Sequence, residues 1–101
     1  MVGVTELAPG SVLNTMPPHR HIRRSEAYLY HDLAPEQRVF HVLGTPQETR
    51  HLVVADSQIA LSPPWSVHAG AGTGSYSFVW VMAGENQSVA DMEACPVATL
   101  M

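Results

Sequence analysis

Four side chains have the types and spacing needed to bind one divalent metal ion. His19 and His21 are two positions apart, Glu26 follows His21 after four residues, and His68 comes 42 residues after Glu26. Side chains at positions i and i+2 of a β-strand point to the same face, so a strand over Pro18 to Ile22 would hold the two imidazoles close together. Imidazole and carboxylate ligands suit Zn, Fe, Mn, Ni or Co, whereas calcium and magnesium sites are built from oxygen.

The segment after the histidine pair predicts how the carboxylate reaches it. Residues 22–25 can form a turn, and the apolar and aromatic run from Glu26 to Tyr30 indicates the neighbouring strand. The competing interpretation is a surface hairpin with titrating histidines, because a chain with six histidines in 101 residues will often place two of them two positions apart.

Strand alternation also predicts which side chains share a pocket with Glu26. Tyr28 and Tyr30 lie on the face of Glu26, while Ala27, Leu29 and His31 lie on the other. The two tyrosines are therefore candidates for a catalytic role, with half-buried packing as the alternative. Glu48 and His51 are further candidates for the catalytic base because they are polar and titratable. His41 lies in an apolar run, which favours a hydrogen-bonded core histidine.

The basic residues are unevenly distributed. All five are arginine, and Arg20, Arg23 and Arg24 surround the histidine pair, with Arg50 further along the chain. The guanidinium group donates in a fork that matches carboxylate or phosphate, so these four arginines are candidates for binding an anionic ligand. A solvated turn or a subunit contact is an equally weighted alternative.

The whole chain has the pattern of an all-β protein. Turn signals containing Pro, Gly, Asp or Asn occur at residues 34–36, 44–46, 56–57, 63–64 and 70–74. Between them we predict short strands at residues 12–14, 18–22, 26–31, 38–43, 50–55, 59–61, 66–69 and 76–82. Regularly spaced short strands favour an antiparallel sandwich or barrel. Residues 84–101 have weaker β character, and we predict a turn of helix around Val89 to Cys95.

Composition limits the setting. A chain of 101 residues with 46% hydrophobic content is expected to form a single domain over residues 1–101. The net charge of −4 argues against nucleic-acid binding, and the lack of a long apolar stretch or a signal peptide argues against a membrane and for the cytoplasm. The single cysteine, Cys95, is expected to be a buried or spare thiol.

The two histidine motifs resemble those of the cupins, which are double-stranded β-helix (jelly-roll) barrels with a metal in the mouth. The segment Pro63 to Gly70 is similar to the second cupin motif, in which His68 matches a ligand, as His19, His21 and Glu26 do in the first. Trp65 replaces the usual glycine of the second motif, and a glycine expected beyond Glu26 is absent. These departures affect turns and not ligands.

A narrower resemblance extends from about Val4 to Gln87. The stretches at residues 5–11, 14–17, 45–51, 62–68 and 84–87 are similar to the 5-keto-4-deoxyuronate isomerases of pectin degradation. This resemblance implies a zinc-dependent, oligomeric ketol isomerase that converts 5-dehydro-4-deoxy-D-glucuronate, an anionic sugar, into 3-deoxy-D-glycero-2,5-hexodiulosonate. It implies zinc held by His19, His21, Glu26 and His68. Members of that family are more than twice as long, and this chain matches their C-terminal, metal-carrying barrel.

Two other functions are compatible with the same residues. Three histidines and one glutamate also serve iron-dependent cupin dioxygenases, and a non-catalytic metal-binding or sugar-binding module needs no further group. A small barrel with unpaired strand edges is also expected to form a homo-oligomer, because subunit contacts can cover such edges.

Overall fold

The computed structural model describes residues 1–21, 24–84 and 93–101 of the chain. Its described part is built from short antiparallel strands and one 3-10 turn, as the sequence predicts. The elements are β1 Val2–Glu6, β2 Leu13–Arg20, β3 Arg24–His31, β4 Val39–Thr45, β5 Glu48–Val54, β6 Gln58–Ser62, β7 His68–Gly72, β8 Ser77–Gly84, β9 Glu93–Ala94 and the turn η1 Val97–Thr99.

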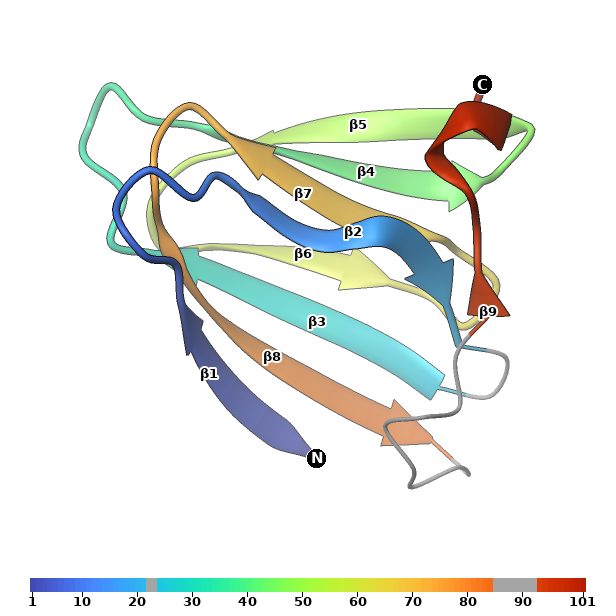
Figure 1. Cartoon of the computed structure of the whole chain (residues 1–101). Helices are drawn as coiled ribbons and strands as arrows, with labels where there is room; N and C mark the ends of the chain where they lie inside the picture. Colours follow the sequence, from blue (N-terminus) through green and yellow to red (C-terminus); the bar gives the residue numbers. More distant parts are fainter. Residues whose placement is uncertain (22–23, 85–92) are drawn as a thin grey trace.

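The strands form two sheets that face each other, as Figure 1 shows. One sheet has the order β1-β8-β3-β6, and the other has the order β5-β4-β7-β2-β9. Neighbours in each sheet are antiparallel, and several are far apart in sequence, as in β2 with β7 and β1 with β8. This arrangement is consistent with a jelly-roll sandwich of the cupin type, and it confirms the predicted fold class.

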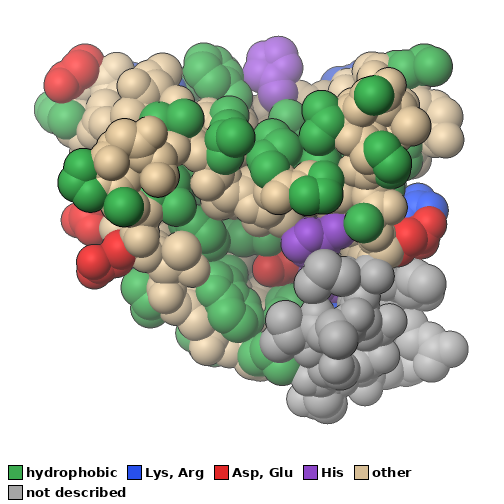
Figure 2. Space-filling view, in the orientation of Figure 1, with side chains coloured by type: hydrophobic (Ala, Val, Ile, Leu, Met, Phe, Trp, Pro, Cys, Tyr) green, Lys and Arg blue, Asp and Glu red, His purple; other side chains and the backbone are tan. Residues whose placement is uncertain are grey.

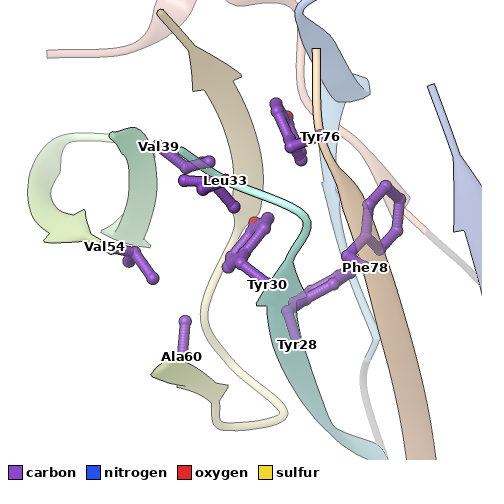
Figure 3. Packing of buried hydrophobic residues seen from close by; sticks show 8 residues of the cluster. All are labelled: Tyr28, Tyr30, Leu33, Val39, Val54, Ala60, Tyr76 and Phe78. Carbon is purple, nitrogen blue, oxygen red and sulfur yellow. The ribbon is translucent and has the colours of Figure 1, made fainter. Parts of the chain in front are cut away.

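Strand β3 shows why the interior is both aromatic and polar. Burial alternates along its length, so that Glu26, Tyr28 and Tyr30 face inward and the residues between them face outward, as predicted. The two tyrosines pack against Phe78 and Tyr76 of the neighbouring segment in the cluster shown in Figure 3. The other members of this cluster are Leu33, Val39, Val54 and Ala60.

Several polar groups in the interior are paired with one another. The ring of His41 is fully buried, and its Nδ1 lies 2.7 Å from the hydroxyl of Tyr30, as expected for a hydrogen-bonded core histidine. The hydroxyl of Tyr76 donates to Oδ1 of Asn14. Gly70 makes room for this network, because a Cβ at this position would lie 2.2 Å from Asn14 Oδ1 and 3.0 Å from the Tyr30 hydroxyl.

Three strand predictions need correction. Strand β1 was not predicted, because its alternation is carried only by Val2 and Val4. Residues 12–14 and 18–22 were predicted as two strands, but β2 is continuous from Leu13 to Arg20, with a shift of register after Asn14. A turn is predicted at residues 70–74, yet Gly70, Ala71 and Gly72 belong to β7, where the crowding around Gly70 and Gly72 favours the smallest residue.

The C-terminal segment also differs from the prediction. Part of the predicted helical turn at Val89 to Cys95 lies outside the described residues, and Glu93–Ala94 is a strand paired with the end of β2. The thiol of Cys95 is free and buried, as expected. Within the described residues, no helix is long and apolar enough to cross a membrane.

The buried histidine makes stability depend on pH. Burial lowers the pKa of His41 to about 4, with a further contribution from His68. An unfolded histidine titrates near pH 6.5, so between pH 6.5 and 4 the unfolded state binds a proton that the folded state does not. The free energy of unfolding of the metal-free chain should therefore decrease as the pH falls through this range, by up to about 1.4 kcal/mol per pH unit for this residue.

We expect His41→Leu to flatten this dependence. Urea unfolding in the presence of a chelator, at several pH values between 4 and 7.5, measures the slope for both proteins. His19 keeps its own contribution in the variant, so some slope remains. An identical slope in the two proteins would contradict a neutral, buried His41.

Candidate metal centre

Strand pairing brings the two sequence motifs together. His19 near the end of β2 is directly opposite His68 at the start of β7, and His21 follows immediately after β2. Glu26 comes from β3 in the facing sheet, where it pairs with Ser62 of β6. The four predicted ligands therefore meet between the two sheets, although His68 is far from the others in the sequence.

The geometry of these four side chains fits one metal ion. One potential ligand atom from each of His19, His21, Glu26 and His68 lies within 4.8 Å of all the others. Glu26 Oε2 lies 3.1 Å from His21 Nε2 and 3.0 Å from His68 Nε2. Zinc bonds of about 2.0 to 2.1 Å in tetrahedral geometry place ligand atoms roughly 3.4 Å apart, so small movements would complete such a shell.

The electrostatics keep two of the ligands, His19 and Glu26, in the forms that bind metal. Burial, together with the neighbouring His68 and His21, lowers the pKa of His19 to about 4. Burial alone would raise the pKa of Glu26. The close approach of His68, together with Tyr28 and His21, outweighs burial, so the pKa of Glu26 is below its ordinary value. At neutral pH the cluster therefore offers a carboxylate and a neutral imidazole, as metal binding requires.

Hydrogen bonds hold two of the imidazoles from behind. Ser62 Oγ lies 3.0 Å from His68 Nδ1, and both side chains are buried. An imidazole that donates its Nδ1–H to this oxygen keeps the Nε2 lone pair free for a metal. His68 Nε2 is buried and faces Glu26 Oε2 at 3.0 Å, on the side where the four potential ligand atoms gather. Arg24 Nη2 donates to His21 Nδ1 over 3.1 Å.

The cluster lies at the inner end of an open pocket. Figure 2 shows histidine and acidic side chains at the hollow between the two sheets. This pocket has a volume of about 210 Å³. Its polar lining is made by Thr5, Thr15, His19, His21, Glu26 and Tyr28, and its apolar wall is made by Phe78, Trp80 and Met82. Substrate-sized molecules could thus approach the carboxylate and two of the imidazoles directly.

The predicted catalytic residues separate into two groups. Tyr28 lines the pocket, and Tyr30 lies deeper, bonded to His41. Glu48 and His51 are on the exposed β5 and are not among the residues that line the pocket. Glu48 and His51 are polar because they lie at the surface, and their polarity does not bring them near the metal-ligand cluster.

Three of the four predicted anion-binding arginines are among the described residues, and they are dispersed. Arg20 is paired with Glu93 at the surface, and Arg50 is paired with Glu48 on β5. Arg24 is buried beside His21, and Arg23 lies outside the described residues. Among the described residues, no arginine lines the pocket.

Several pocket residues were not anticipated from the sequence. Phe78, Trp80 and Met82 alternate on the predicted strand 76–82, so strand parity alone could have placed them on one inward face. Thr15 falls between two segments predicted as separate strands. Ser62, which lies behind His68 and not in the pocket lining, gave no signal because its contact depends on the connection between β6 and β7.

Comparison with known proteins shows the family of the chain. The model of the KduI/IolB family matches residues 1–96. The chain belongs to this family. A 4-deoxy-L-threo-5-hexosulose-uronate ketol-isomerase from Kineococcus radiotolerans is 60% identical over 100 residues, which cover 99% of this chain and 36% of the relative.

Other members of the family show the same relation. The 4-deoxy-L-threo-5-hexosulose-uronate ketol-isomerase 2 of Rhizobium meliloti is 57% identical to this chain. The 4-deoxy-L-threo-5-hexosulose-uronate ketol-isomerase of Shouchella clausii is 54% identical. Each match covers 99% of this chain and 36% of the relative. The chain therefore spans about a third of the length of these curated relatives.

The hydrogen bond behind His68 can be tested directly. We expect Ser62→Ala to weaken zinc affinity by about 10-fold to 100-fold, because the imidazole loses the acceptor that fixes its tautomer and orientation. Competition with a chromophoric chelator measures the affinity without any need for activity.

Ser66→Ala is the matched control. Ser66 is also buried, but its hydroxyl bonds backbone groups of Gly44 and Val67, away from the ligands. This variant should lose stability and keep its zinc affinity. Equal zinc affinity in Ser62→Ala and the unmodified chain would show that Ser62 does not position His68.

Proposed function

We propose that this chain is the metal-binding, catalytic part of a ketol isomerase acting on a 4-deoxy-5-keto uronate, the substrate class in the names of its relatives. The observation that carries the proposal is the open pocket that His19, His21 and Glu26 line together. A structural metal site would be closed on all sides, whereas a catalytic site needs an accessible face. With four protein ligands, substrate binding would have to expand the shell or displace one ligand, and Glu26 is the ligand that we propose would move.

The chemistry of the reaction matches this donor set. An aldose-ketose isomerisation removes a proton from a carbon next to a carbonyl and stabilises the charge that develops on oxygen. A divalent ion held by His19, His21, Glu26 and His68, with zinc as the proposed ion, would supply Lewis acidity to the carbonyl without redox change. The rest of the catalytic work falls to the residues of the pocket.

Tyr28 is the pocket residue best placed to handle a proton. Its hydroxyl lies 3.5 Å from Thr15 Oγ1, and burial raises its pKa, with the nearby Glu26 adding to the shift. A phenol with a raised pKa stays protonated at neutral pH, so we assign Tyr28 as a hydrogen-bond donor to a substrate oxygen and not as the resting base.

The polar wall suits a hydroxylated, anionic sugar. Thr5 and Thr15 contribute hydroxyl groups that can bond substrate oxygens. Arg24 lies behind His21 and places a positive charge near the cluster, which favours an anion. We propose that this charge, and not a bidentate pair, attracts the carboxylate.

The proposal predicts turnover by the zinc-loaded chain. NMR spectroscopy can follow the conversion of 5-dehydro-4-deoxy-D-glucuronate, with His68→Ala as the control that lacks a ligand. We expect conversion above the background rate for the unmodified chain and none above background for the control. Zinc binding without turnover would instead identify a non-catalytic metal-binding module, consistent with a chain about a third as long as its relatives.

Tyrosine variants separate a catalytic effect from a structural one. Tyr28→Phe should lower kcat by about 100-fold or more, with little change in zinc affinity, because only the donated proton is lost. Tyr30→Phe, which removes a hydroxyl bonded to His41 away from the pocket lining, should lower stability and leave kcat nearly unchanged. An equal loss of kcat in both variants would argue against the role of Tyr28.

A further inference from the structure

A chain of hydrogen-bonding side chains leads from the core to the pocket. The hydroxyl of Tyr76 donates to Asn14 Oδ1, and Asn14 Nδ2 donates to Thr15 Oγ1 over 3.1 Å. Thr15 Oγ1 in turn lies 3.5 Å from the hydroxyl oxygen of Tyr28. Thr15 and Tyr28 line the pocket, whereas Asn14 and Tyr76 are buried and are not among the lining residues.

The backbone at Thr15 has an unusual conformation. Its φ of 57° lies in the left-handed region, which a β-branched residue rarely adopts. The pairing of β2 with β7 also shifts register between Asn14 and His19. Irregularities of this kind redirect side chains, and here the Thr15 hydroxyl faces the pocket. Such a conformation persists where neighbouring contacts hold it, and the bond from Asn14 is one of these contacts.

Tyr28 has one hydroxyl proton and two neighbours that could accept it. One is Thr15, and the other is the carboxylate of Glu26. Against the effect of burial, His68 and then a hydrogen bond from Tyr28 lower the pKa of that carboxyl. An ionised carboxylate can only accept, so Tyr28 donates toward Glu26 and its oxygen is left to accept from Thr15.

The other end of the chain imposes the same direction. With Oδ1 of Asn14 accepting from Tyr76, only Nδ2 of the amide can face Thr15, and it must donate. If the amide were turned over, the buried Tyr76 proton would have no acceptor among the described residues, at a cost in stability. Both ends therefore direct the protons from Tyr76 toward the pocket.

We propose that Asn14 is a positioning residue that, through Thr15, directs the proton of Tyr28 toward the metal-ligand cluster. This inference rests on the proposed function, in which Tyr28 donates to a substrate oxygen. It also assigns a role to Thr15, whose oxygen accepts from Asn14 and donates to Tyr28. One lone pair then remains on that oxygen, so a substrate hydroxyl can donate to Thr15 but cannot accept from it.

Neutron diffraction from a deuterium-exchanged crystal of the zinc-loaded chain tests the directions themselves. We expect the Thr15 deuteron to lie between Thr15 Oγ1 and the Tyr28 oxygen, and the Tyr28 deuteron to lie on the side of Glu26. A Tyr28 deuteron directed at Thr15 Oγ1 would overturn the proposal. This measurement requires no turnover, so it gives its answer even if the proposed isomerase activity is absent.

Asn14→Leu tests the consequence for catalysis. This variant removes the donor to Thr15 and lets the Thr15 oxygen accept from Tyr28 instead. We expect kcat to fall by about 10-fold or more, with KM and zinc affinity nearly unchanged, because Asn14 does not line the pocket. The variant also leaves the buried Tyr76 hydroxyl without its acceptor, so its unfolding temperature should fall.

The double variant Asn14→Leu/Tyr76→Phe separates positioning from stability. Both partners of the buried bond are then apolar, so much of the lost stability should return. The value of kcat should stay as low as in Asn14→Leu. A kcat that recovers together with the unfolding temperature, or an unchanged kcat in folded Asn14→Leu, would assign Asn14 a structural role only and overturn the proposal.

Variants of Thr15 keep the test decisive if Asn14→Leu does not fold. Thr15→Val keeps the branched shape and removes the hydroxyl, so kcat should fall by about 10-fold or more. Thr15→Ser restores the hydroxyl and should recover most of that loss. If Thr15→Ser were as slow as Thr15→Val, the hydroxyl would not be what connects Asn14 to Tyr28.

Discussion

The approach of one carboxylate to imidazoles from the opposite sheet is the interaction on which the site depends. Glu26 reaches across from β3, while His19 and His68 come from a directly paired position on β2 and β7. Buried polar groups in such numbers are costly unless each has a partner. A metal ion would satisfy the carboxylate and the free imidazole nitrogens together, and it would join the two sheets at the same point.

This constraint explains the contrast between the inside and the outside of the sandwich. The interior near the cluster contains tyrosines, histidines and Asn14 bonded to one another, as in Tyr30 with His41. The outside of the sheet that carries Glu26 is aliphatic. On strand β3 the polar side chain of Glu26 therefore lies on the inner face, beside the cluster, and Ala27 and Leu29 lie on the outer face.

Much of the fold and the centre of the site could be predicted from the sequence. The alternation along residues 26–31 predicts that Glu26 and Tyr28 point inward, as they do in β3. The two-residue spacing of His19 and His21 predicts that their imidazoles lie close together. Sequence could not place Ser62 behind His68, because that contact depends on how the connection between β6 and β7 turns from one sheet to the other. The sequence also could not show that Tyr28, and not Glu48, is the candidate catalytic residue in the pocket. Both side chains are polar, and polarity alone does not say which face of a sheet lines the pocket.

X-ray absorption spectroscopy of the chain loaded with one equivalent of zinc tests the central claim most directly. The account predicts a shell of nitrogen and oxygen ligands at about 2.0 to 2.2 Å, with the multiple scattering of three imidazoles. A sulfur ligand at about 2.3 Å, which only Cys95 or a methionine could supply, would contradict it. So would a shell of water oxygens with one imidazole or none, because the four side chains would then not hold the ion.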